Sequence, residues 1–149
     1  MTTYLCDVNV WLALALSAHA HQSQARRWLE TVDVAASVIF CRSTQQSLLR
    51  LLTNAAVLAP YGNAPLNNRE AWGAYEAFIR DDRVVMQVRE PDGLEPQWRA
   101  YAERPTASPK LWMDAYLAAF AFAGGHMLVT TDGAFKQFAG LDVMVLSAT

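Results

Sequence analysis

Residues 4–12 read Tyr-Leu-Cys-Asp-Val-Asn-Val-Trp-Leu and contain the strongest indication of the fold class. Its first half predicts a short strand from Thr3 to Asp7, and its second half predicts a helix beginning near Val8 or Asn9. The change from strand to helix occurs within one or two residues, as in the units that build a parallel sheet. If this stretch begins such a sheet, further strand–helix pairs should follow it along the chain.

Four further apolar, β-branched runs predict strands over residues 35–41, 83–88, 127–130 and 143–146. Helical spacing predicts helices over 20–31, 42–56, 94–101 and 110–123, with Gly124-Gly125 as the last stop. A loop over 60–68 precedes another helix, for which Asn68 is the expected cap, and 133–138 predicts a short helix. Strands that alternate with helices define an α/β protein whose sheet is mainly parallel and covered on both faces. We expect one domain over residues 1–149.

Composition limits the classes of function. The chain is 53% hydrophobic and 17% charged with a formal net charge of −2, so a packed globule is expected. Since there is no general basic field, nucleic-acid binding requires a local patch or a metal ion. Cys6 and Cys41 lie in apolar strand-like segments and are expected to be reduced core thiols.

The apolar run Val10–Leu16 looks like the centre of a signal peptide, but no Lys or Arg precedes it, and Asp7 and Asn9 interrupt its start. No other run reaches the roughly 18–20 apolar residues that cross a membrane. We therefore expect a soluble, cytoplasmic protein that does not bind membranes.

Three isolated aspartates lie in apolar segments: Asp7, Asp114 and Asp132. Asp7 and Asp132 follow predicted strands, and Asp114 lies in the first turn or so of the helix before the second of those strands. Carboxyl ends of parallel strands share one edge of the sheet, where ligands bind in such folds. Because grouped carboxylates favour hard divalent cations, the three predict a Mg²⁺ or Mn²⁺ site.

Each aspartate also has a purely structural interpretation. Asp7 is suited to capping the next helix, Asp114 to the positive end of its helix dipole, and Asp132 to a turn before Gly133. Asn9 either caps a helix or orients Asp7 and its water, and Thr131 is a candidate hydrogen-bond donor to a carboxylate.

Four segments in order resemble the PIN-domain ribonucleases, and within them the VapC-like toxins of bacterial toxin–antitoxin pairs. They are residues 4–12, Thr-Gln-Gln-Ser-Leu-Leu-Arg-Leu-Leu-Thr-Asn (44–54), Trp-Met-Asp-Ala-Tyr-Leu-Ala-Ala-Phe-Ala (112–121) and Val-Thr-Thr-Asp-Gly-Ala-Phe (129–135). The resemblance covers nearly the whole chain. It implies a three-layer sandwich with a five-stranded parallel sheet, and RNA cleavage by a water that Mg²⁺ or Mn²⁺ activates. It also implies inhibition by a cognate antitoxin and a homodimer.

The resemblance places Asp7, Asp114 and Asp132 at the family's acidic positions, and two departures stand out. The family's second acid aligns best with Gln45, with Gln46 as the alternative, and a further acid is replaced by Ala134. A glutamine offers a neutral carbonyl oxygen or orients water, but brings no charge to a second ion. We therefore predict that Gln45 supports a site that holds one ion at rest.

Three cations are predicted to contact RNA phosphates, namely Arg42, Arg50 and Lys110, although isolated surface cations are also common without any such role. Trp11, Leu14 and Trp28 are candidates for dimer or antitoxin contacts unless they fold into the core.

Two other interpretations compete with the nuclease. In a haloacid-dehalogenase-type phosphatase, Asp7 would be the nucleophile, but its usual acid–base partner two residues on is Asn9 here. In a degenerate module that binds RNA or protein without cutting, Gln45 and Ala134 would mark the lost activity.

Overall fold

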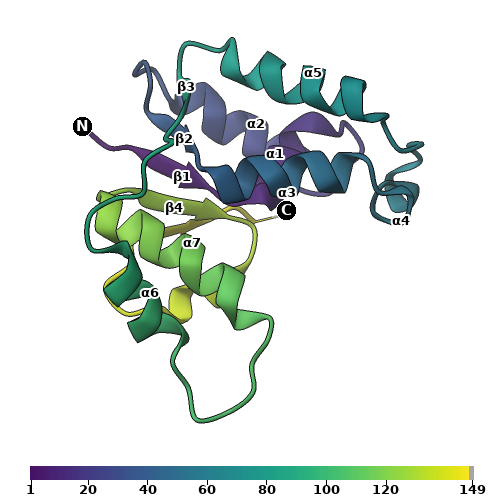
Figure 1. Ribbon diagram of the computed structural model, residues 1–149. Coiled ribbons are helices and arrows are strands. Elements are labelled where there is room, and N and C mark those ends of the chain that lie inside the picture. Colours follow the sequence, from purple (N-terminus) through teal and green to yellow (C-terminus); the bar gives the residue numbers. More distant parts are fainter. Residues whose placement is uncertain (148–149) are drawn as a thin grey trace.

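A computed structural model of the protein describes residues 1–147 and shows an α/β fold built around one sheet (Figure 1). Its strands are β1 (Tyr4–Cys6), β2 (Val38–Phe40), β3 (Val84–Met86), β4 (Met127–Thr130) and β5 (Val143–Val145). The order across the sheet is β3-β2-β1-β4-β5, and every neighbouring pair is parallel. The predicted fold class is confirmed, and the sheet is parallel throughout.

Helices cover both faces of the sheet (Figure 1). One face carries α1 (Val8–Ala15), α2 (Gln22–Thr31), α3 (Arg42–Leu52) and α5 (Asn68–Ile79), while α4 (Ala55–Leu58) and the 3₁₀ turn η1 (Ala59–Tyr61) connect α3 to α5. The other face carries α6 (Leu94–Ala102), α7 (Leu111–Gly124) and the 3₁₀ turn η2 (Gly133–Gln137).

The strands divide their side chains between two apolar cores because successive side chains alternate faces. Cys6 and Val129 belong to the core under α1, α2, α3 and α5, whereas Leu5 and Leu128 belong to the core under α6 and α7. Cys6 and Cys41 are both buried free thiols, as expected.

The proposed interface residues Trp11, Leu14 and Trp28 lie in the core instead. Trp11 is fully buried and stacks on Phe40 with ring centroids 3.8 Å apart, and Leu14 and Trp28 are also buried. The prediction that they form dimer or antitoxin contacts is therefore wrong in this fold. Their apolar stripe faces the sheet, which helices of a two-faced sandwich must cover.

Several element boundaries differ from the predicted ones for local reasons. The helix predicted over 42–56 is two helices, because the Asn54 side chain accepts the amide hydrogens of Ala56 and Val57 and starts α4. Asn67, not Asn68, caps α5, and it forms a reciprocal capping box with Glu70.

The predicted strands over 35–41 and 83–88 are each shortened to three residues. Ala36 has a positive φ of 55°, which is incompatible with a strand, and Cys41 is already the N-cap of α3. The predicted short helix over 133–138 is the 3₁₀ turn η2.

Candidate active site

The acidic residues gather where the strand order reverses. From β1 the chain builds β2 and β3 on one side and then crosses to β4 on the other. Ligands of open parallel sheets bind beyond the carboxyl ends of the strands at such a reversal. Asp7 follows β1 and Asp132 lies two residues after β4, while Asp114 stands in the first turn of α7, the helix that leads into β4.

Asp7 is a buried carboxyl group whose charge the protein only partly compensates. It is 8% exposed and stands at the N-cap position of α1, but its side chain makes no capping hydrogen bond there. The pKa of Asp7 is raised to about 6, mainly by burial and to a smaller extent by the carboxylates of Asp114 and Asp132, while hydrogen bonds from Thr130 and the Val8 amide act in the opposite direction. The simple capping interpretation of Asp7 therefore does not account for this residue.

Thr130 links two of the acids. Its hydroxyl donates to Asp7 Oδ2 over 3.0 Å, and the same oxygen accepts the backbone amide hydrogen of Asp132 over 3.0 Å. This is the role predicted for Thr131, and the structure gives it to the preceding residue. The register explains why: Leu5 pairs with Leu128, so Asp7 and Thr130 come next on the same face of adjacent strands.

Asp114 and Asp132 complete the acidic group. Partial burial raises the pKa of Asp114, and the nearby carboxylate of Asp132 adds to the rise. Asp132 is exposed, and its Oδ1 accepts the amide hydrogen of Ala134 over 2.9 Å. The turn role predicted for Asp132 is thus present, together with its electrostatic coupling to the other two acids.

Of the two neighbouring glutamines that were considered for the site, Gln45 is buried, with 5% of its surface exposed, and Gln46 is exposed. The Gln45 amide oxygen accepts a hydrogen bond of 2.6 Å from Arg42, so this part of α3 carries a positive charge. Asn9 is an exposed residue in the first turn of α1, and across residues 1–147 its side chain makes no hydrogen bond.

The other two predicted cations occupy different places. Lys110 is exposed and directly precedes α7, within one turn of Asp114. Arg50 lies two turns further along α3 than Arg42, in a shallow pocket that it shares with Trp72 of α5. Arg42 contacts Gln45 and Lys110 lies near Asp114, whereas Arg50, on the same helix as Gln45, lies farther from both.

The donor chemistry fits a hard divalent cation. A buried carboxyl group with a raised pKa and two neighbouring carboxylates is a site that a positive ion would stabilise. Within residues 1–147, no three His, Cys, Asp or Glu side chains stand close enough to hold one ion directly. Mg²⁺ usually keeps several of its waters and takes only one or two protein carboxylates.

Comparison with known proteins agrees with this arrangement. Residues 4–141 match the model of the PIN domain, and this chain belongs to that family. The haloacid-dehalogenase interpretation is therefore wrong. None of the described helices is long and apolar enough to cross a membrane.

Among curated proteins, the chain is 60% identical over 143 residues to Ribonuclease VapC41 of Mycobacterium tuberculosis, a match that covers 96% of this chain and 98% of the relative. It is also 29% identical to Ribonuclease VapC29 of the same species, over 99% of this chain and 98% of that protein.

Solved structures share the fold at low sequence identity. VapBC2 from Rickettsia felis, bound to a DNA fragment from its promoter, gives a TM-score of 0.69 at 12% identity, over 97% of this chain and 98% of that one. VapC20 of Mycobacterium tuberculosis is described as a toxin that cleaves the sarcin–ricin loop. Its structure gives a TM-score of 0.65 at 18% identity, over 93% of this chain and 96% of that one.

Proposed function

We propose that this protein is a divalent-metal-dependent endoribonuclease and the toxin of a toxin–antitoxin pair, built as one PIN-like domain. The observation that carries the proposal is the buried Asp7 carboxyl group, coupled to Asp114 and Asp132 at the strand-order reversal of a PIN fold. A relative that is 60% identical and named a ribonuclease supports the same reaction.

Asp7, Asp114 and Asp132 would hold Mg²⁺ or Mn²⁺, partly through water. When bound, such an ion lowers the pKa of a coordinated water and neutralises charge that develops on the phosphodiester. The chain's own residues would position the ligands of that ion, because Thr130 fixes the orientation of the Asp7 carboxylate and of the backbone at Asp132. Asn9 is exposed in the first turn of α1, just after Asp7, where its amide would reach bound water.

Gln45 and Arg42 have a different proposed role. Their hydrogen bond holds the Arg42 guanidinium at the start of α3, next to the edge where β2 ends. A fixed guanidinium suits a phosphate oxygen, because it presents several donors in one plane. Arg42 with Lys110 is therefore the phosphate-binding pair of the proposal, and Arg50 is a more distant contact along the RNA.

The proposed partners are RNA, a cognate antitoxin and a second copy of the chain, and the proposed location is the cytoplasm. Two structural relatives support the antitoxin: VapBC2 from Rickettsia felis and VapBC from Salmonella typhimurium, both named as VapBC assemblies bound to DNA. Because Trp11 and Trp28 are buried, these contacts fall to other surfaces.

The test is cleavage of total cellular RNA by purified, antitoxin-free protein with Mg²⁺, with Mn²⁺ and with EDTA. Asp7→Asn and Asp114→Asn are the site variants, and Asp92→Asn is the matched control, because the Asp92 side chain is 98% exposed in a surface ion pair. We expect discrete fragments that vanish with EDTA and in both site variants but persist in the control. Cutting that survives in both site variants would reject this site.

A second candidate function, RNA or protein binding without cleavage, is favoured by one feature. Gln45 is neutral and already bonded to Arg42, and Ala134 offers no ligand, so the charge of the site rests on three carboxylates. A folded wild type that binds RNA without cutting it under any metal condition would establish this function instead.

A further inference from the structure

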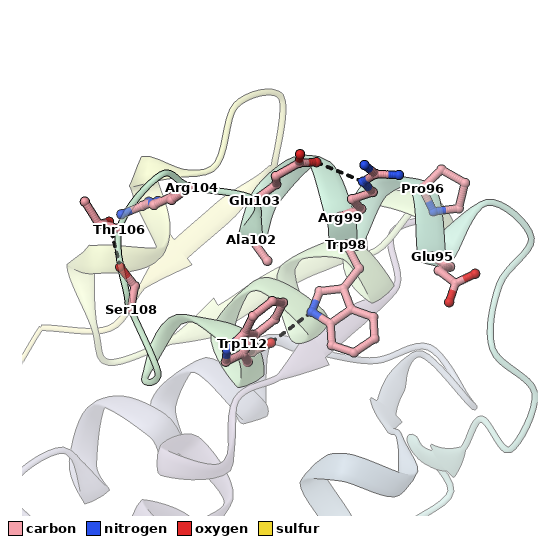
Figure 2. Close-up of a pocket in the computed structure, with 10 residues that line it drawn as sticks. All are labelled: Glu95, Pro96, Trp98, Arg99, Ala102, Glu103, Arg104, Thr106, Ser108 and Trp112. Carbon is pink, nitrogen blue, oxygen red and sulfur yellow. Dashed lines mark hydrogen bonds and ion pairs between the residues drawn. The ribbon is translucent and has the colours of Figure 1, made fainter.

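A groove opens on the side of the molecule that carries α6, the loop over residues 103–110 and the first turn of α7 (Figure 2). Its volume is about 750 Å³, enough for a nucleobase with part of its ribose. Trp98 and Trp112 lie along one side, and Arg104, Thr106 and Ser108 lie toward the loop end. The groove thus combines aromatic surface with hydrogen-bonding groups.

Trp112 is an exposed aromatic side chain on a fixed backbone. The indole is 56% exposed, yet Trp98 Nε1 donates to the Trp112 carbonyl oxygen over 3.0 Å, and the two rings pack edge to face with centroids 6.4 Å apart. These contacts hold the turn that carries Trp112 and leave much of its ring open. A large apolar side chain left exposed in this way is the kind of surface that marks a binding site.

Positive charge at the loop end of the groove is not neutralised locally. Arg99 is paired with Glu103 at 2.8 Å, but Arg104 donates to the neutral amide of Gln137 at 2.6 Å. In the part of the chain that the structure describes, neither Arg104 nor Lys110 forms an ion pair with a carboxylate. The one unpaired acid of the groove, Glu95, lies at the other end (Figure 2).

The groove and the acidic site use opposite sides of the N-terminal turn of α7. Trp112 and Asp114 are two residues apart on α7, so their side chains project about 200° apart around the helix. Lys110, four residues before Asp114, lies on the Asp114 side of the helix start. A strand of RNA held at Asp114 would cross the N-terminal end of α7, past Lys110, before it reached Trp112.

We propose that this groove binds one unstacked base of single-stranded RNA, a nucleotide or two away from the bond that is cut. Trp112 is the stacking platform, and Arg104 and Lys110 contact the flanking phosphates. The substrate class is then a loop or single strand rather than a duplex, because a base must leave its stack to reach an aromatic ring. The proposal rests on the proposed ribonuclease function and names its substrate.

The test measures binding of a labelled single-stranded oligouridylate of about 12 nucleotides, and of the matched RNA duplex, in EDTA so that no cutting occurs. The variants are Trp112→Ala and Trp112→Phe. Phe122→Ala is the control, since Phe122 is 45% exposed near the C-terminal end of α7, outside the groove. We expect Trp112→Ala to weaken single-strand binding about five- to hundredfold and Trp112→Phe to restore most of it.

Arg104→Gln provides a second, independent variant. We expect it to weaken binding and to reduce the slope of log affinity against log salt by about 0.7, as for one lost phosphate contact. Equal affinities of Trp112→Ala and Phe122→Ala, or duplex binding as tight as single-strand binding, would overturn the proposal. A change of oligomeric state in Trp112→Ala with unchanged RNA affinity would also overturn it, because the groove would then be a protein interface.

The outcome also separates this proposal from the ribonuclease function itself. If the wild type cuts RNA and Trp112→Ala cuts and binds as the control does, the nuclease stands and the base subsite fails. If no metal condition gives cutting but Trp112→Ala still loses binding, the groove stands as an RNA-binding site and the nuclease fails.

Discussion

Thr130 holds the acidic site together through a single hydroxyl group. The oxygen donates to the Asp7 carboxylate and accepts from the Asp132 amide, so it sets the position of two of the three acids at once. Groups that orient a metal-binding carboxylate often matter nearly as much as the carboxylate itself.

Replacing Thr130 with valine removes this hydroxyl and keeps the shape of the side chain. Because both hydrogen bonds are lost in a buried setting, we expect the unfolding free energy to fall by about 1–3 kcal/mol. We also expect RNA cleavage to fall about 10- to 100-fold. Denaturant titration and initial cleavage rates measure the two effects. Thr131→Val is the matched control, and equal losses in the two variants would contradict the assignment of this role to Thr130.

The charge of Asp7 works against folding in the absence of metal. Its pKa in the folded protein is about 6, above the ordinary value of 3.8, so between these values the folded state holds more protons than the unfolded chain. The unfolding free energy therefore falls as pH rises through this window, and the full penalty is present above about pH 6.

Asp7→Asn removes that penalty while keeping an oxygen to accept from Thr130. In EDTA at about pH 7.5 we expect the variant to be more stable than the wild type by about 1–3 kcal/mol, from the difference in pKa. At about pH 3 the gain should largely disappear, since the wild-type carboxyl group is then mostly neutral in both the folded and the unfolded state. Denaturant titrations at both pH values test this. A variant that is less stable than the wild type at both would contradict the prediction, because the protein's own groups would then fully compensate the Asp7 carboxylate without metal.

At the residue scale, the sequence singles out the three acids because each interrupts or follows an apolar segment, whereas Gln45 was predicted from the resemblance to PIN-domain ribonucleases, and the roles of all four stay predictions. The choice between Thr130 and Thr131 needed the strand register, which aligns Leu5 with Leu128. The Arg42–Gln45 hydrogen bond could not be predicted from the sequence either, because a spacing of three residues on a helix allows such a contact but does not require it.

At the scale of elements, Arg83 anchors the C-terminal end of α2 to the start of β3. Its Nη1 donates to the Leu29 carbonyl over 2.7 Å and more weakly to that of Val32, and its Nε and Nη2 form a fork with Asp81 at 3.0 and 2.7 Å. The last carbonyl groups of a helix lack hydrogen-bond partners within the helix, and this guanidinium supplies a donor to them.

Arg83→Lys keeps the charge but cannot reproduce the fork and the carbonyl contacts together. We expect a loss of about 1–2 kcal/mol in unfolding free energy, as for one or two partly exposed hydrogen bonds to a charged group. Thermal or denaturant unfolding measures it, with Arg80→Lys as the control because its ion pair with Glu76 is 3.9 Å long on the surface. Unchanged stability in Arg83→Lys would contradict this role, because water would then satisfy the carbonyl groups of α2 as well as the guanidinium does.

The periodicity of hydrophobic residues predicted which segments are helices and which are strands. It did not predict where several of these elements begin and end. Asn54 sits inside a helical pattern and still starts a new helix, since its side chain outcompetes the backbone for two amides. Ala36 sits inside an apolar strand-like run, and its positive φ is imposed by the turn rather than by its own preference.

At the scale of the whole molecule, alternation of strands and helices was sufficient to predict a parallel sheet covered on both faces. It did not reveal which apolar surfaces remain free. Trp11 and Trp112 both stand beside apolar residues in the sequence, yet Trp11 of α1 is fully buried and Trp112 of α7 is 56% exposed beside the groove. That difference depends on how α6 and α7 pack, which is a long-range property.

If the fold brings the three acids together for an ion, then the ion should stabilise the whole molecule. At a metal concentration of about 100 times its dissociation constant, binding to the folded state alone adds about 2.7 kcal/mol. For a chain of this size that corresponds to a rise in Tm of roughly 5–10 °C. We expect Mn²⁺ to produce this rise in the wild type and EDTA to reverse it. Asp7→Asn and Asp114→Asn should start from their own Tm and gain much less, whereas Asp92→Asn should respond as the wild type does. A rise of the same size in the two site variants would place the ion elsewhere, because the acids at the strand-order reversal would then contribute nothing to its binding.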